Sequence, residues 1–194
     1  MSRSPVKELV FFLEEPSARE MLKGVLPRLL SSDVVPRYVV FEGKQDLHKR
    51  LEKKLKGWIN TNARFIVLRD QDKGDCVETK NRLFGICQKA GKNKNETLIR
   101  IACHELESWY LGDLDAVEKG LGIKGITKNQ DTKKYRSPDR LTNPSQELKR
   151  LTKQAYQKVS GSRDIGPFLS LRDNRSHSFK MFISGIRRLI RNPI

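Results

Sequence analysis

The sequence predicts an α/β protein with a mostly parallel four-stranded sheet, helices on both faces of the sheet, and a basic, helical C-terminal elaboration. Two observations carry this prediction. Short apolar runs alternate with segments of helical periodicity, in the order expected of strand-helix-strand units with right-handed crossovers. The chain of 194 residues is also long enough to bury one α/β core and to add a small group of helices.

Four segments have the character of strands and end in polar or turn-forming residues. Residues 6–13, in which Leu9 to Leu13 are apolar without interruption, lie between Pro5 and Glu14, and this pattern is typical of a central strand buried on both faces. The segment after residue 63 is similar, and it leads directly into a group of aspartates. After the first strand, three more are predicted, at residues 38–41, 64–69 and 98–103.

Helices are predicted between these strands and throughout the C-terminal part. Ser17 is expected to cap the first helix, with Glu20 completing a capping box. Asp75 is a second predicted cap, and Asn143, followed by a proline, is a third. The predicted helices lie near residues 17–30, 47–58, 75–87, 105–111, 114–121, 143–156 and 176–190, and residues 122–142 are predicted to form a long surface loop.

Charge is distributed unevenly, and this predicts two parts of the chain with different roles. The net charge is +16, and residues 124–194 hold 17 Lys and Arg against 5 Asp and Glu, a net of +12. We expect residues 1–121 to form the α/β core with the acidic site, and residues 122–194 to form a basic elaboration packed on it. Such a surface suits nucleic acid. The alternatives are a solvated basic surface and an acidic partner protein.

Several classes of protein are disfavoured by composition. Cys76, Cys87 and Cys103 are odd in number and lack CxxC spacing, which argues against a disulfide framework and a zinc site. The longest apolar stretch, residues 9–13, is far shorter than a membrane span. The first residues lack the apolar core of a signal peptide. We therefore expect a cytoplasmic protein that does not insert into a membrane.

Acidic residues follow the first and third predicted strands, at the edge where parallel sheets bind their ligands. Glu14 and Glu15 follow the first strand, and Asp70 and Asp72 follow the third. Carboxylates brought together repel one another unless a cation intervenes, and Mg²⁺ or Mn²⁺ prefers such oxygen ligands. In an extended segment Asp70 and Asp72 should point the same way, with Gln71 facing away. The choice between Glu14 and Glu15 stays open, and turn formation is the alternative for the aspartates.

A further acidic segment follows the fourth predicted strand. Glu105 and Glu107 would lie about 200° apart on a helix, so only one of them can face the acidic edge. Glu107 is the candidate metal ligand, and a solvated helix face is the alternative. Trp109 and Tyr110 are predicted to belong to the core.

Taken together, these features resemble a known family. The N-terminal hundred residues resemble the Toprim fold of topoisomerases, primases and the nucleases of the overcoming-lysogenisation-defect (OLD) class. The whole chain resembles domain-of-unknown-function family 4276, a set of Toprim-like bacterial proteins. The segments that carry the resemblance are Leu13–Ala18, Gly43–Leu47, Asp70–Asp72, Arg100–Asp113, Tyr135–Asp139 and Ser176–Phe179.

The resemblance implies a Mg²⁺-dependent nuclease that hydrolyses phosphodiester bonds in DNA or RNA. It also implies an ABC-type ATPase as partner, in a system of defence against phage. The nuclease class tends to carry a second glutamate one helical turn after the first, and Ala18 stands there in this chain. The implied catalytic and metal-binding residues are Glu14, Asp70 and Asp72, with Glu15 and Glu107 as further candidate metal ligands.

Basic residues near the acidic edge are expected to contact the substrate. Lys44, Lys49 and Arg50 could steer a nucleic-acid strand, and Arg175 could clamp it. Arg100, within a predicted strand, is expected to pair with a nearby acid. The alternative function is a non-catalytic adaptor with a Toprim core that binds nucleic acid or an ATPase. A phosphatase of the haloacid dehalogenase type is disfavoured, because it needs an aspartate where the first strand ends in glutamates.

Overall fold

The computed structural model describes residues 8–191, and its centre is a four-stranded sheet in which every pair of neighbouring strands is parallel. The strand order is β2-β1-β3-β4. The predicted α/β class is confirmed, and residues 6 and 7 of the first predicted strand lie outside the described residues. The strands are β1 (Glu8–Leu13), β2 (Val35–Val40), β3 (Ala63–Asp70) and β4 (Thr97–Ala102).

The two central strands are apolar throughout because each contributes to two separate hydrophobic clusters. In β1, Phe11 belongs to the cluster on one face of the sheet, and Phe12 belongs to the cluster on the other face. In β3, Ile66 and Val67 divide in the same way. Successive side chains of a strand point to opposite faces, so a sheet covered on both sides requires such continuous apolar runs.

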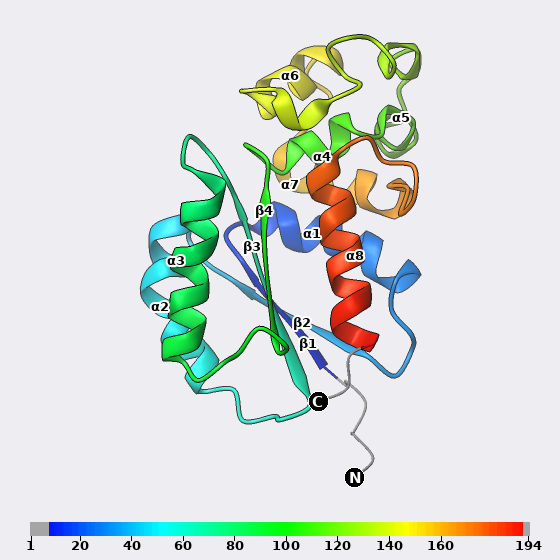
Figure 1. Cartoon of the computed structure of the whole chain (residues 1–194). Helices are drawn as coiled ribbons and strands as arrows, with labels where there is room; N and C mark the ends of the chain where they lie inside the picture. The colour runs from blue at the N-terminus through cyan, green and yellow to red at the C-terminus, as the bar shows by residue number, and fades with distance from the viewer. Residues whose placement is uncertain (1–7, 192–194) are drawn as a thin grey trace.

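Four long helices cover the two faces of the sheet (Figure 1). On one face lie α2 (Lys44–Lys56) and α3 (Cys76–Lys89), and on the other lie α1 (Pro16–Val25) and α8 (His177–Arg191). Each faces the sheet with apolar residues, as Leu47 and Leu51 do from α2 and Phe182 does from α8. The predicted helices on both faces are thus present.

A helical lobe lies beyond the end of the sheet at which the strands end (Figure 1). It consists of α4 (Glu107–Leu111), α5 (Leu114–Leu121), α6 (Pro144–Leu151) and α7 (Lys158–Ile165). The predicted loop at residues 122–142 contains two short 3-10 turns, and its Tyr135 is buried. The lobe brings α4 and α7 over the carboxyl edge of the sheet.

Helix α7 packs against α1, and the turn at residues 166–168 that follows α7 approaches the backbone of α1 closely. A Cβ atom on Gly24 would lie 2.4 Å from the backbone nitrogen of Pro167, and one on Gly166 would lie 2.6 Å from the carbonyl oxygen of Met21. Only glycine fits both positions. The sequence does not predict α7, because its segment contains Ser160, Gly161 and Ser162 and lacks a clear apolar period.

The apolar core joins the two predicted parts of the chain. Trp109 of α4 is fully buried, and its ring centroid lies 5.2 Å from that of Phe179 and 4.9 Å from that of Phe182. Its Nε1 donates a hydrogen bond of 2.8 Å to Ser178 Oγ. Tyr110 is also fully buried, so both residues belong to the core as expected. The helix α8 is thereby fixed to the segment that follows β4.

The predicted start of the first helix is wrong. Pro16 occupies the first helical position, where a missing N–H and a fixed φ are tolerated, and Glu15 precedes it as N-cap without a side-chain cap. Ser17 Oγ donates to Glu15 Oε2 instead of capping the helix. Glu20 pairs with Lys23 at 3.0 Å, so there is no capping box.

The other two predicted caps have different outcomes. Asp75 is confirmed, since its carboxylate accepts a hydrogen bond of 2.7 Å from the backbone N–H of Glu78. Asn143 makes no side-chain cap. At that helix, Glu105 Oε2 accepts a hydrogen bond of 2.7 Å from Ser145 N. A residue distant in sequence therefore satisfies the first turn of α6.

Between residues 8 and 191, no helix has both the length and the apolar character that crossing a membrane requires.

Candidate metal centre

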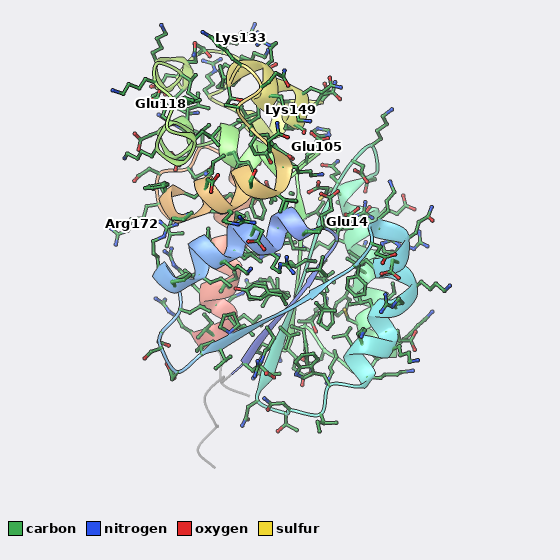
Figure 2. All side chains as sticks on the ribbon, turned by 180° about the vertical axis from the view of Figure 1, so that it is seen from behind. Glu14, Glu105, Glu118, Lys133, Lys149 and Arg172 are labelled. Atoms are coloured by element: carbon green, nitrogen blue, oxygen red, sulfur yellow. The ribbon has the colours of Figure 1, made fainter. Side chains whose placement is uncertain are left out.

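Carboxylates from three segments approach one another at the carboxyl edge of the sheet, and we call Glu14, Glu15, Asp70 and Glu107 the acidic centre. Glu14 follows β1, and Figure 2 shows it at the upper end of the sheet beneath the helical lobe. Its Oε2 accepts a hydrogen bond of 3.1 Å from the backbone N–H of Asp70, the last residue of β3. The parallel register of β1 and β3 brings the two acids together.

The acidic centre is electrostatically unfavourable for the charged form of its members. Burial raises the pKa of Asp70 well above its ordinary value, and the charges of Glu107, Glu15 and Glu14 raise it further. Burial also raises the pKa of Glu14 and that of Glu107. Such an arrangement favours either protonation or a bound cation.

Glu107 carries an oxygen that lacks a hydrogen-bond donor. Its side chain is fully buried, and its Oε1 accepts a hydrogen bond of 2.9 Å from the hydroxyl of Tyr156. No residue in the described part of the chain donates to Oε2. An unpaired buried acceptor costs about 1–3 kcal/mol. The oxygen donors of the acidic centre thus fit a hard divalent cation such as Mg²⁺.

Lys158 supplies a positive charge inside the acidic centre. Its Nζ forms an ion pair with Glu15 Oε2, and its charge lowers the pKa of both Asp70 and Glu107. The residue is the first of α7. Sequence reasoning missed Lys158 and Tyr156, because both lie more than 85 residues from Asp70 in a segment without a recognisable motif. Their basic and aromatic character was the only signal.

Asp72 does not point the same way as Asp70, contrary to the expectation for an extended segment. The strand ends at Asp70, and Asp72 has a φ of 56°, in the left-handed region. Its Oδ2 accepts hydrogen bonds from Lys44 Nζ at 2.9 Å and from Arg69 at 3.2 Å. Asp72 therefore lies on the α2 side of the edge, where two cations neutralise it.

Arg69 separates the acidic centre from Asp72. It is only 6% exposed, and its Nε donates to the carbonyl oxygen of Asp70 at 2.7 Å. The same Nε lies 3.6 Å from Glu14 Oε2. Within residues 8–191, no group of three or more His, Cys, Asp or Glu side chains is already arranged to hold a metal ion. Metal binding by Glu14, Asp70, Asp72, Glu15 or Glu107 stays a prediction.

The predicted nucleic-acid contacts occupy different surroundings. Lys49 is exposed near the acidic edge, as is Lys44, which pairs with Asp72. Arg50 pairs with Asp46 at 3.0 Å, and Arg175 pairs with Asp131 at 2.7 Å. Only the first two line the same cleft as Asp72.

The expectation that Arg100 pairs with an acid is wrong. Its Nε donates to the carbonyl oxygen of Met181 at 3.0 Å, and its Nη1 donates to that of Ile99 at 2.9 Å. Burial lowers the pKa of its guanidinium. Arg100 therefore ties β4 to α8 and has a structural role.

The parallel sheet, its helical layers and the acidic edge define a Toprim-like α/β protein. Residues 13–187 match the model of the family described as Domain of unknown function (DUF4276). The chain belongs to this family.

Solved structures agree with this assignment of the fold. Two structures of the C-terminal region of the Xanthomonas campestris pv. campestris OLD protein, phased with iodine and with mercury, match with a TM-score of 0.51 each. Their identities are 14% and 12%, and the matches cover 94% of this chain and 95% of theirs. The comparison with curated proteins found no match. The Toprim-like fold expected from the sequence is confirmed.

The raised pKa values predict how stability depends on pH in the absence of metal. An acid whose pKa is higher in the folded state binds extra protons there, so its contribution to stability falls as the pH rises through the folded pKa. Asp70 is such a group, and Asp70→Asn removes its titration. In EDTA, the stability advantage of Asp70→Asn over wild type should grow as the pH rises above about 4, because the pKa of Asp70 is raised above its ordinary value of 3.8. Thermal unfolding of both proteins from about pH 4 upward measures this difference, and a constant or shrinking difference would contradict the raised pKa of Asp70.

Proposed function

We propose that the protein is a Mg²⁺-dependent nuclease that hydrolyses phosphodiester bonds in DNA or RNA, with Mn²⁺ as an alternative cation. The observation that carries the proposal is the acidic centre, in which the buried Glu107 has an oxygen without a donor beside Asp70. It lies at the edge where parallel sheets bind their ligands. The fold, shared with the C-terminal region of an OLD protein, supports the same assignment.

Different residues of the chain would have different roles in such a site. Glu14, Asp70 and Glu107 would hold the cation, Glu15 is a further candidate ligand, and Asp72 is a candidate that Lys44 and Arg69 hold in this structure. A bound divalent cation supplies Lewis-acid polarisation of a phosphoryl oxygen and neutralises charge that develops there. Burial of Glu14 and Glu107 limits access of water to the centre.

The second candidate function is a non-catalytic adaptor that binds nucleic acid or an ABC-type ATPase. The ion pair of Lys158 with Glu15 and the proximity of Arg69 to Glu14 favour it, because internal cations already balance part of the acidic charge. The family resemblance also supports the proposal that the protein acts together with an ATPase in defence against phage.

Cleavage assays distinguish the two functions. Labelled single- and double-stranded DNA and RNA are incubated with the protein in Mg²⁺, Mn²⁺ or EDTA, and metal binding is measured in parallel by calorimetry. The nuclease predicts cleavage in Mg²⁺ or Mn²⁺ and none in EDTA. Metal binding without cleavage, with and without an ATPase partner, would favour the adaptor. Absence of both metal binding and cleavage would overturn the nuclease proposal.

Tyr156→Phe should weaken metal binding about tenfold, as expected when the residue that orients a metal ligand is removed. The substitution keeps the ring and removes the hydroxyl that donates to Glu107 Oε1. Tyr110→Phe is a matched control, because its equally buried hydroxyl donates to Ser162 Oγ at 2.8 Å and not to a carboxylate. Calorimetric titration of Mn²⁺ measures both. Equal weakening in the two variants would show that the Tyr156 hydroxyl has no special role.

A further inference from the structure

A cleft of about 820 Å³ opens beside the acidic centre, between α2, α3 and the loop that follows β3. Five cationic side chains line it, and Asp72 is the only Asp or Glu among the residues that form it. We call it the basic cleft. The cations that define it are Lys44, Lys49, Arg69, Lys73 and Arg82.

The positive charge of the basic cleft is only partly neutralised. Lys44 and Arg69 both pair with Asp72. Lys49, Lys73 and Arg82 are exposed and make no ion pair with any residue between 8 and 191. These three come from α2, from the loop and from α3, so uncompensated charge comes from all three segments that line the cleft.

A histidine in the cleft lies in the same positive field. Burial lowers the pKa of His48, and the charges of Arg82, Arg69 and Lys44 lower it further. Its Nε2 lies 3.4 Å from Arg69 Nη1. An anion in the cleft would relieve this repulsion as well as meet the unpaired cations.

The basic cleft and the acidic centre share one side chain. Arg69 donates to Asp72 in the cleft, and its Nε lies 3.6 Å from Glu14 Oε2 in the acidic centre. A polyanion bound in the cleft therefore lies directly beside the carboxylates. A single small anion would leave cations on the opposite wall unpaired, whereas consecutive phosphates along a strand can meet all of them.

We propose that the basic cleft binds consecutive backbone phosphates of a nucleic-acid strand and leads that strand to the acidic centre. The proposal rests on the proposed function for the class of substrate. It adds Lys73 and Arg82, which sequence reasoning did not single out, to Lys44 and Lys49. It leaves Arg50 and Arg175 out of the strand-binding surface, because each pairs with an aspartate outside the cleft.

The test measures binding in the absence of cleavage. Fluorescence anisotropy in EDTA gives the affinity for labelled single-stranded DNA and RNA over a range of salt concentrations. The variant Lys73→Ala/Arg82→Ala should bind about tenfold more weakly, and its log-log salt slope should fall by about 1.4, because each phosphate that a cation neutralises accounts for about 0.7 of the slope. Lys49→Ala, on the α2 wall, should lower the slope by about 0.7.

The matched control removes two charges from another side of α2. Lys53→Ala/Lys54→Ala changes exposed lysines that do not line the basic cleft, and it should leave the salt slope nearly unchanged. An equal fall in affinity for control and cleft variants would overturn the proposal, because binding would then depend on net charge alone. Binding in EDTA that depends on the cleft, without cleavage in Mg²⁺, would retain the cleft and reject the nuclease.

Discussion

Asp70→Asn is expected to lower Mg²⁺-dependent cleavage about a thousandfold or more, while stabilising the metal-free fold by about 1 kcal/mol. Asp70 lies among Glu14, Glu15 and Glu107, and these neighbours raise its pKa. The asparagine amide replaces a carboxylate metal ligand, and the substitution also removes one of the negative charges that repel one another in the acidic centre. A substitution that lowers activity and raises stability identifies a residue that contributes to function at the expense of folding stability.

The control for this substitution is another aspartate at the same edge. Asp75→Asn changes the residue that caps α3, where asparagine caps about as well as aspartate, so neither activity nor stability should change markedly. Cleavage rates in Mg²⁺ and urea unfolding in EDTA measure both effects. If Asp70→Asn cleaves as fast as wild type, Asp70 does not belong to a catalytic metal site.

Trp109→Ala is expected to destabilise the whole protein by about 4 kcal/mol. The indole is fully buried between Phe179 and Phe182, and its Nε1 donates to Ser178. Its removal leaves a cavity where α4 meets α8 and leaves a buried hydroxyl with one donor fewer. The C-terminal helix should therefore unfold together with the sheet.

Urea unfolding followed by circular dichroism and by fluorescence of Trp58 tests this expectation. Trp58 lies in the cluster on the other face of the sheet, so it reports on the core at a distance from the substitution. Phe168→Ala, at an exposed aromatic, is the control and should change stability by less than about 0.5 kcal/mol. Separate transitions for helix content and for Trp58 would show that residues 122–194 fold independently of the core.

The sheet could be predicted from the sequence because its signals are local. Residues 9–13 and 65–68 are apolar without interruption, and Asp75 stands three residues before Glu78. Each signal is contained within a few residues, so neither the rest of the chain nor its three-dimensional contacts were needed to recognise it. The placement of the acids at the carboxyl edge followed from the order of strands and helices, because parallel strands end at the same edge of the sheet.

Other features depend on contacts between distant residues and could not be predicted. In the first turn of α6, the backbone N–H of Ser145 donates a hydrogen bond to the side chain of Glu105, and the side chain of Asn143 makes no cap. Helix α7 lacks a clear apolar period, yet it packs against α1, and the turn that follows it approaches α1 closely at Gly24 and Gly166. Its Lys158 reaches Glu15, from more than 140 residues away, only because of that packing.

Asp72 shows the limit of reasoning from alternation alone. The rule that alternate residues face one way holds only while the backbone stays extended, and here the chain turns at Asp72 with a φ of 56°. Two nearby cations, Lys44 and Arg69, make that turn favourable. Asp72, which was predicted to be a metal ligand, is therefore oriented toward the basic cleft. Glu107, which was predicted as a further candidate ligand, belongs to the acidic centre.

Crystals grown in Mn²⁺ test most directly whether these carboxylates share one cation. The anomalous difference map should show a peak bounded by Glu14, Asp70 and Glu107, at about 2.0–2.3 Å from their oxygens, with Lys158 displaced from the acidic centre. A map without a peak at saturating Mn²⁺, with Lys158 still paired with Glu15, would contradict the metal centre and the nuclease that depends on it.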